Sequence, residues 1–277
     1  MDDWIGSFGP GQRVLDLGSG AGSFPLARFR ATLVWLDEDL DAFGTAPEVP
    51  SGAYYRVFGS GGRLPFAARS FDLVICHHAL EHIADPAATL REVARVLQPG
   101  GQLYIAVPDG YTLSDGLYRF LFKGGGHVNR FRRRELVALV EETTGLALAR
   151  WQTLYSSFAY LDRLRRLLEA PPPDLPRRLL ALRCVPPAAL TAWQWALYVF
   201  SRVADRLLGT RLSSYGWALF FSPGAPRAVE TPGYVNVCLC CGMGEEAANL
   251  QRHKRVAFLC SNCNHINPYC PPFGTAQ

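Results

Sequence analysis

Short apolar runs alternate with stretches of helical spacing through roughly the first 155 residues. Six such runs predict buried strands, at residues 13–17, 33–36, 54–58, 71–76, 103–107 and 147–154. Three stretches predict helices, at residues 24–30, 86–97 and 134–144, and Asp85 is placed to cap the second. Residues 98–101, Gln-Pro-Gly-Gly, predict a turn. This strand–helix alternation predicts an α/β fold with a doubly wound parallel sheet.

The pattern changes after residue 155. Residues 156–212 have helical spacing and are rich in Leu, Arg and Trp, and residues 215–221 predict one more strand. Several prolines follow in a predicted linker, and the last part is rich in cysteine. The predicted organisation is a first domain of residues 1–155 and 213–222, a helical insertion or cap at 156–212, a linker at 223–233 and a cysteine module at 234–277.

Composition narrows the class of protein. The chain of 277 residues is 49% hydrophobic and 19% charged, which is typical of a globular protein. A net charge of +4 neither requires nor excludes an anionic partner. The first residues lack the basic and apolar regions of a secretory signal, and the longest apolar stretch, near residues 188–200, is too short for a membrane span. A cytoplasmic protein is expected, in which eight cysteines need an explanation other than disulfides.

A glycine-rich turn follows the first predicted strand. Gly18, Gly20 and Gly22 allow a tight turn whose backbone amides face a ligand at the strand end. A dinucleotide-binding loop more often reads G-x-G-x-x-G, and Ser23 occupies its third glycine position here. Asp16, directly before the loop, suits a cationic amino group better than a pyrophosphate. The sequence therefore favours a nucleoside-type ligand, with a dinucleotide as the weaker alternative.

An ordered set of motifs runs through residues 10–155, in the segments 14–22, 64–66, 70–74, 79–83, 97–101, 127–131, 135–136 and 144–146. Together these motifs resemble class I S-adenosylmethionine (SAM)-dependent methyltransferases of the type-11 family, which includes quinone-biosynthesis enzymes. The resemblance implies a Rossmann-like, seven-stranded sheet whose last strand, residues 215–221, is antiparallel. It also implies SAM as the methyl donor.

The resemblance assigns a set of cofactor-binding residues. The loop and Asp16 lie beside the methionine part of SAM, Asp37 binds the ribose, and Cys76 and His77 flank the methionyl group. Many relatives carry an acid after the third strand that contacts the adenine, and Ser60 replaces it here. The full expected set is Asp16, Gly18, Ser19, Gly20, Gly22, Asp37, Ser60, Gly61, Cys76 and His77.

Four histidines are candidates for orienting or deprotonating the acceptor. His77 and His78 follow a strand that ends at the cofactor, and His127 follows three glycines in a loop able to close over a site. His82, with Glu81, recurs in the family and has the alternative role of orienting the next loop. A general base is needed only where the acceptor is a weak acid such as a phenol or an alcohol.

Two Cys-x-x-Cys pairs mark the C-terminal module. Cys238 and Cys241 are separated by eighteen residues from Cys260 and Cys263, a spacing typical of a structural zinc site with four thiolates. Cys240 is an alternative to Cys238 as a ligand. The module resembles a zinc ribbon, and the basic turn at residues 252–255 is a candidate nucleic-acid contact.

Three functions remain open at this point. The first is a methyltransferase for a small, hydrophobic or lipid-like acceptor, covered by the aromatic residues of the insertion. Those aromatics have the alternative role of packing against the sheet or a second copy, and arginines among the leucines of this segment would suit a peripheral membrane contact. The second is an RNA or protein methyltransferase that recruits its target through the ribbon. The third is a SAM-binding scaffold without turnover. The sequence does not predict the oligomeric state.

Overall fold

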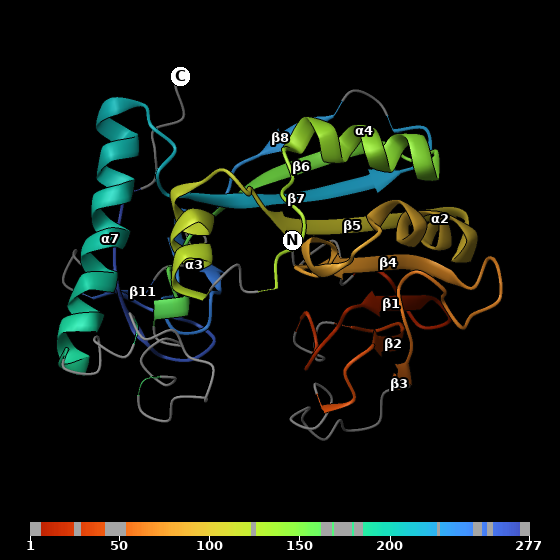
Figure 1. Ribbon diagram of the computed structural model, residues 1–277, viewed down its shortest axis with the longest axis horizontal. Coiled ribbons are helices and arrows are strands. Elements are labelled where there is room, and N and C mark those ends of the chain that lie inside the picture. The colour runs from red at the N-terminus through yellow and green to blue at the C-terminus, as the bar shows by residue number, and fades with distance from the viewer. Residues whose placement is uncertain are drawn as a thin grey trace. The chain divides into compact units, whose positions relative to one another are not determined.

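The computed structural model describes most of the chain, in two compact units (Figure 1). The first unit comprises Met1–Gly110, Gly126–Gln152 and Trp217–Thr231, and the second Tyr111–Gly125, Thr153–Gly216 and Pro232–Gln277. The whole predicted insertion, residues 156–212, therefore falls in the same unit as the cysteine module. The described residues are 7–24, 29–41, 54–122, 126–161, 168, 179, 185–225, 228–245, 251–253 and 257–271.

A central sheet of eight strands has the order β3-β2-β1-β4-β5-β7-β6-β8. The pairs β1–β2, β1–β4, β2–β3, β4–β5 and β6–β8 are parallel. The predicted fold class, a Rossmann-like sheet of parallel strands with one antiparallel edge, is confirmed. The strand bounds are β1 Arg13–Leu17, β2 Thr32–Asp37, β3 Tyr54–Phe58, β4 Phe71–His77, β5 Leu97–Pro108, β6 Ala147–Tyr155, β7 Ser214–Ser222 and β8 Val229–Thr231.

Three details differ from the sequence-based expectation. The sheet has one strand more than the seven expected, because β8 lies within the predicted linker and pairs with β6. The predicted turn at residues 98–101 is part of β5, where the pairing passes from Phe71–Leu97 to Leu73–Gln102 and leaves extra residues on β5. The predicted helix at residues 24–30 falls mainly on residues 25–28, outside the described part of the chain.

Two helices of the first unit complete its main core. Helix α2 (Pro86–Val96) begins where the Asp85 carboxylate accepts a hydrogen bond from the Ala88 amide at 2.9 Å, as the sequence predicted. Helix α4 (Arg133–Thr144) ends at Gly145, whose φ of 71° is left-handed. Both helices lie against the sheet (Figure 1). Apolar side chains of the two helices, such as Val93 and Val140, belong to the same core cluster as the strand residues. This packing fixes the strand ends that carry the candidate site.

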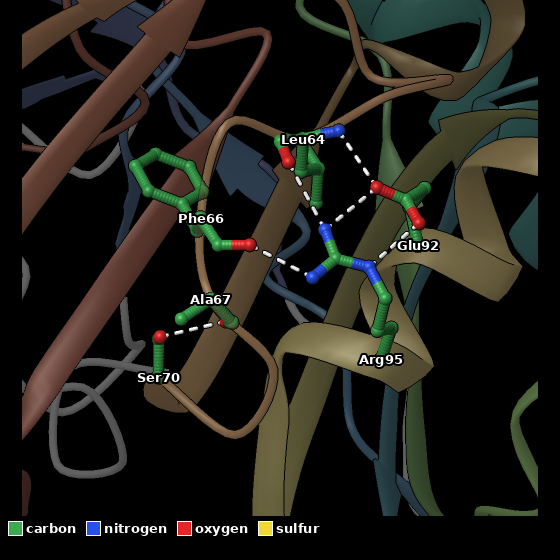
Figure 2. A network of polar contacts seen from close by, with 6 residues as sticks. All are labelled: Leu64, Phe66, Ala67, Ser70, Glu92 and Arg95. Carbon is green, nitrogen blue, oxygen red and sulfur yellow. Dashed lines mark hydrogen bonds and ion pairs between the residues drawn. The ribbon is translucent and has the colours of Figure 1, made fainter.

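The loop that follows β3 is tied to α2 by one arginine (Figure 2). Arg95 donates to the carbonyls of Phe66, at 2.7 Å, and Leu64, at 3.0 Å, while its Nε and Nη2 contact Glu92 at 2.7 and 2.8 Å. Glu92 in turn accepts from the Leu64 amide at 2.8 Å. The hydrogen bond from Arg95 holds the pKa of Glu92 below its ordinary value. The loop between β3 and β4 is thereby fixed at its C-terminal half.

The second unit is built around the long helix α7 (Pro187–Leu208). Its core includes Tyr198 from this helix, Phe158 from the segment after β6, and Val235 and Leu239 from the cysteine module. Two small sheets complete the unit, with strands β9 Asn236–Val237, β10 Gly244–Glu245, β11 Gln251–His253, β12 Ala257–Leu259 and β13 Ile266–Pro268. A shorter helix, α3 (Leu113–Phe122), belongs to the same unit and adds Leu121 to the core.

Arg202 is a fully buried cation that connects α7 to two other segments of the second unit. Its guanidinium donates to the carbonyls of Val235 at 2.9 Å and Ser156 at 2.8 Å and lies 3.6 Å from the centre of the Tyr198 ring. The Tyr198 hydroxyl donates to the same Val235 carbonyl at 3.2 Å and accepts from the Val237 amide at 3.1 Å. This network attaches the start of the cysteine module to the helix.

Replacing Arg202 with methionine is expected to destabilise the second unit by about 3–5 kcal/mol. The change leaves two buried carbonyls without their charged donor and removes the contact with the Tyr198 ring. Denaturant unfolding, followed by circular dichroism, measures the loss. The exposed Arg206 of the same helix supplies the control, and an R202M midpoint equal to that of R206M would contradict the assigned role.

The aromatic residues of the predicted insertion divide into two groups. Tyr198 and Phe158 are fully buried in the second unit, whereas Trp193 and Phe200 are 55% and 62% exposed. The arginines considered for a membrane contact lie outside the described residues; they are Arg163, Arg165, Arg166, Arg177 and Arg178. Within the described part, no helix combines the length and the apolar character that crossing a membrane requires. Packing thus accounts for one group of aromatics and leaves the exposed group without an assigned role.

Candidate functional site

The predicted cofactor residues gather at the carboxyl ends of adjacent parallel strands. Asp16 near the end of β1 pairs in register with Trp35 of β2 and Ile75 of β4. The last residues of these neighbours, Asp37 and His77, therefore reach the same edge of the sheet. Ligands of open α/β sheets bind at this edge.

The glycine loop needs glycine for two physical reasons. Gly18, Gly20 and Gly22 all have positive φ, at 66°, 49° and 105°. A Cβ on Gly18 would lie 2.5 Å from the Ala79 Cβ, and one on Gly22 would lie 2.4 Å from the Trp35 ring, so both positions exclude larger residues. A Cβ on Gly20 would meet nothing within 4 Å. The backbone of Gly20 is therefore open to a ligand.

Asp37 is hydrogen-bonded to the glycine loop. Its Oδ2 accepts a hydrogen bond from the Gly20 amide at 2.7 Å and its Oδ1 accepts from the Asp39 amide at 3.0 Å. Each carboxylate oxygen keeps a second lone pair for a ligand hydroxyl. Ser19, in the same loop, is buried, and its Oγ makes no hydrogen bond with the described residues. A buried hydroxyl without a hydrogen-bond partner costs free energy, and a polar ligand would supply that partner.

Asp16 is a buried carboxylate with one local partner. Ser23 donates to it twice, from its amide to Oδ2 at 2.9 Å and from its Oγ to Oδ1 at 2.6 Å. Burial, with a smaller contribution from Asp37, raises the pKa of Asp16 to about 6 despite these hydrogen bonds. A cation bound here would offset that desolvation, which agrees with the amino-group role expected for Asp16.

The end of β4 is apolar and uncharged. Cys76 is buried, and that burial raises the pKa of its thiol far above the ordinary value. The His77 Nδ1 lies 3.2 Å from the hydroxyl of Tyr104 on β5, and Phe24 covers the ring at a centroid distance of 4.9 Å. Burial and the neighbouring His78 hold the pKa of His77 well below its ordinary value, so the imidazole is neutral at neutral pH. A neutral imidazole beside a phenol can donate or accept a hydrogen bond.

Ser60 and Gly61 lie on the loop after β3. The preceding Gly59 donates its amide to the Asp37 carbonyl at 3.0 Å, which places the loop beside the end of β2. Ser60 is exposed, and a Cβ on Gly61 would lie 3.2 Å from Thr89 of α2. The Thr89 Oγ1 is buried and accepts no hydrogen bond from the described residues. The loop after β3 therefore has polar groups, Ser60 and the Thr89 Oγ1, next to Gly61.

The remaining histidines lie just beyond β4 in the first unit. The His78 Nδ1 is 3.6 Å from the Glu81 Oε1, and His78 has a left-handed φ of 54°. His82 lies in the short 3-10 helix η3 (Leu80–His82), and its ring meets that of His127 edge-on at 4.8 Å. The predicted glycine loop before His127 lies at residues 124–126, of which only Gly126 is described. The four histidines thus form two pairs. His77 and His78 lie at the end of β4, and His82 of η3 lies beside His127.

The four predicted zinc ligands of the second unit lie together. Cys238 and Cys263 have sulfurs 3.6 Å apart, as do Cys241 and Cys260, and all four sulfurs lie within 4.8 Å of one another. The first Cys-x-x-Cys turn closes where the Gly242 amide donates to the Cys238 carbonyl at 3.0 Å. The second closes in the same way from Asn264 to Cys260, also at 3.0 Å.

Cys240 lies outside this group of sulfurs. Its side chain is exposed, and its amide donates to the Cys238 sulfur at 3.4 Å. Such amide bonds favour the thiolate form of a cysteine. The cluster has the number and type of donors that a tetrahedral zinc ion requires.

Comparison with known proteins identifies the fold family. Residues 4–149, just over half of the chain, match the methyltransferase domain. The chain belongs to the methyltransferase domain family. The matched segment contains the glycine loop, Asp37 and the end of β4, so the candidate site lies within the recognised domain.

The curated relatives share only part of their length with this methyltransferase-family chain. A demethylmenaquinone methyltransferase from Mycolicibacterium paratuberculosis is 38% identical over 119 residues, 42% of this chain and 49% of that protein. A ubiquinone biosynthesis O-methyltransferase from Xanthomonas axonopodis pv. citri is 33% identical over 152 residues, 50% of this chain and 64% of that protein. The chain spans about half to two thirds of the length of these two relatives.

A solved structure has a similar fold. The YcgJ protein from Bacillus subtilis has a TM-score of 0.55 and 20% sequence identity, covering 82% of this chain and 97% of that one. At this level of identity the likeness concerns the fold alone.

Several residues of this methyltransferase domain have contacts that the sequence did not indicate. Ser23 was noted only as a departure from the dinucleotide motif, yet it is the hydrogen-bond partner of Asp16. The sequence indicated only a strand residue at Tyr104, whereas in the structure its hydroxyl contacts His77. The sequence indicated only a helical residue at Thr89, whereas in the structure its side chain lies next to Gly61. An acid followed at short range by serine in a glycine loop is a usable signal for the first contact, whereas the others depend on strand register and helix packing.

Proposed function

We propose that this chain is a SAM-dependent methyltransferase that acts on a small, hydrophobic molecule. The observation that carries the proposal is the hydrogen bond between the Gly20 amide and the Asp37 carboxylate, at 2.7 Å. It joins the open glycine loop to an acid at the end of the next strand, the two parts that a nucleoside with a charged tail requires. Membership of the methyltransferase domain family supports SAM as that nucleoside.

In the proposed complex each polar group of the site has one task. Asp16 faces the cationic amino group of the methionine part, and the unsatisfied Ser19 hydroxyl bonds its carboxylate. Asp37 accepts the ribose hydroxyls with its remaining lone pairs. Ser60 and Thr89 border the adenine. These groups place the sulfonium near the end of β4.

The proposed reaction needs alignment more than acid–base chemistry. SAM supplies the activated methyl group as a sulfonium, and holding an acceptor in line with it can lower the barrier by about 7–11 kcal/mol. Cys76 and the aromatic ring of Phe24 keep the surroundings of His77 apolar and so exclude water. The neutral His77, whose Nδ1 contacts the Tyr104 hydroxyl, is proposed to orient a hydroxyl acceptor through a hydrogen bond.

The small C-terminal sheets are proposed to be a zinc ribbon. Four thiolates around one ion would replace the apolar core that strands of two or three residues cannot build. Cys238, Cys241, Cys260 and Cys263 are the proposed ligands. The proposed role is structural, because four protein ligands leave no open position on a tetrahedral ion.

SAM affinity is expected to fall below about pH 6. The free site holds Asp16 partly protonated up to its raised pKa of about 6, and that proton must leave before the carboxylate faces an ammonium group. Affinity should be constant near pH 7 and fall about tenfold per unit at lower pH. By the same shift, the unliganded fold loses stability as pH rises from 3.8 through about 6. Calorimetry between pH 5 and 7 measures the effect, and a slope that persists in D16N would contradict it.

Methyl transfer tests the proposal. The full chain is incubated with methyl-labelled SAM and either a small-molecule extract that contains hydroxylated quinones or an RNA and protein fraction. The proposal predicts label in the organic extract, lost in D37A. Label only in the RNA or protein fraction would favour recruitment through the ribbon. SAM binding without label anywhere would indicate a scaffold.

A further inference from the structure

One buried acid of the first unit has no partner in the proposed reaction. Glu81 of η3 is 1% exposed, and neither of its carboxylate oxygens accepts a hydrogen bond from the described residues. The nearest cation candidate is His78, whose Nδ1 lies 3.6 Å from Oε1, beyond hydrogen-bond distance. An ionised carboxylate buried in this way is costly unless a cation accompanies it. Glu81 therefore has unused capacity to bind a positive charge.

Two imidazoles share that surrounding. The donor atoms of Glu81, His82 and His127 all lie within 4.8 Å of one another. The rings of His82 and His127 meet edge-on at 4.8 Å between centroids. His82 is exposed and His127 half-buried, so the imidazole side of the cluster is open to solvent. An ion can enter from that side.

The cluster is held by the backbone rather than by chance contact of side chains. The amides of Val128 and Asn129 both donate to the Glu81 carbonyl, at 2.9 and 3.0 Å. The Asn129 side chain donates to the Ile83 carbonyl at 2.6 Å and to the Leu80 carbonyl at 3.3 Å. These four bonds fix the segment that carries His127 against η3. A site built from two distant parts of the chain is thus preorganised.

We infer that Glu81, His82 and His127 form a binding site for a divalent transition-metal ion. Two imidazoles and one carboxylate are the donor set that first-row divalent ions accept while keeping open positions. The site differs from the cysteine cluster in its unit, its donors and its open coordination.

The position of this site gives the ion a task in the proposed reaction. Ala79, two residues before Glu81, lies so close to Gly18 that a Cβ on that glycine would come within 2.5 Å of it. The metal site therefore borders the loop proposed to hold SAM. An ion with open positions binds an acceptor hydroxyl and lowers its pKa, which favours a phenolic or enolic acceptor. This last step rests on the proposed methyl transfer, whereas metal binding does not.

Cobalt binding to the full chain tests the inference independently of methyl transfer. Co²⁺ is the probe, because thiolate ligands give it intense near-ultraviolet charge-transfer bands, whereas imidazole and carboxylate ligands give only weak visible bands. The chain is first loaded with one Zn²⁺, which fills the cysteine cluster. The expected result is then one Co²⁺ bound per chain with the weak visible spectrum alone. His82→Ala and His127→Ala should each weaken this binding at least tenfold. His265→Ala, at an exposed histidine of the other unit, is the matched control and should leave it unchanged.

Two results would overturn the inference. One is the absence of any Co²⁺ with the imidazole and carboxylate spectrum in the wild-type chain. The other is equal Co²⁺ affinity in the wild type and in His127→Ala. Circular dichroism verifies that the histidine variants are folded, and the exposure of His82 makes its replacement the safer of the two. Failure of methyl transfer alone leaves this outcome unaffected, because the titration requires neither SAM nor acceptor.

Discussion

Replacing Asp37 with alanine is expected to weaken SAM binding by about 100-fold or more. The change removes the acceptor of the Gly20 amide and the proposed acceptor of the ribose hydroxyls together. Each charge-assisted hydrogen bond is worth about 1.5–3 kcal/mol, and 1.4 kcal/mol is a tenfold change in affinity. Calorimetric titration of the variant with SAM measures the loss.

The control for this prediction is a variant that keeps the shape of the side chain. Asp37→Asn retains one oxygen acceptor and should lose less affinity than the alanine variant. Asp39→Ala, two residues along, removes an exposed acid whose amide contacts Asp37 and should bind SAM nearly as the wild type does. A D37A variant that binds SAM within threefold of the wild type would remove Asp37 from the site.

Removal of zinc is expected to unfold the cysteine module and to destabilise the rest of the second unit. Strands β9 to β13 contain two or three residues each, so they bury too little apolar surface to fold without the ion. Structural zinc contributes on the order of 10–16 kcal/mol in small zinc-binding peptides. Cys260→Ser should therefore lose its zinc and become protease-sensitive within residues 234–271. Elemental analysis and limited proteolysis measure both effects.

Cys240→Ser is the matched control for the zinc prediction. Cys240 is exposed and only its amide contacts the cluster, so the variant should keep one zinc per chain. Loss of zinc in C240S with retention in C238S would instead favour the alternative ligand set. A C260S variant with a full complement of zinc and unchanged protease resistance would contradict the ribbon.

The central strands of the sheet were predictable because they are buried on both faces. Such strands are continuous apolar runs, as at Arg13–Leu17 and Phe71–His77, and the glycines between them have functions that only glycine fulfils. The helix starting after Asp85 was predictable because its cap is local in sequence. Local chemistry of this kind can be read without knowledge of the tertiary structure.

Features that depend on long-range contacts were not predictable. Strand β8 has three residues and lies among prolines, and only its pairing with β6 makes it a strand. Arg202 looks like an ordinary helical arginine in the sequence, yet carbonyls from two other segments surround it. The meeting of Glu81 with His127 depends on hydrogen bonds between segments more than forty residues apart. In these three cases the role of the residues follows from a contact between distant segments, which the residue type does not indicate.

Calorimetric titration of the full chain at pH 7.5 with SAM, its demethylated product and a nicotinamide dinucleotide tests the central claim most directly. The account predicts one SAM per chain and competition by the demethylated product. It also predicts no detectable heat with the dinucleotide, because Asp16 faces a cation and Ser23 replaces the third glycine of the dinucleotide motif. Binding of the dinucleotide without binding of SAM would contradict the account.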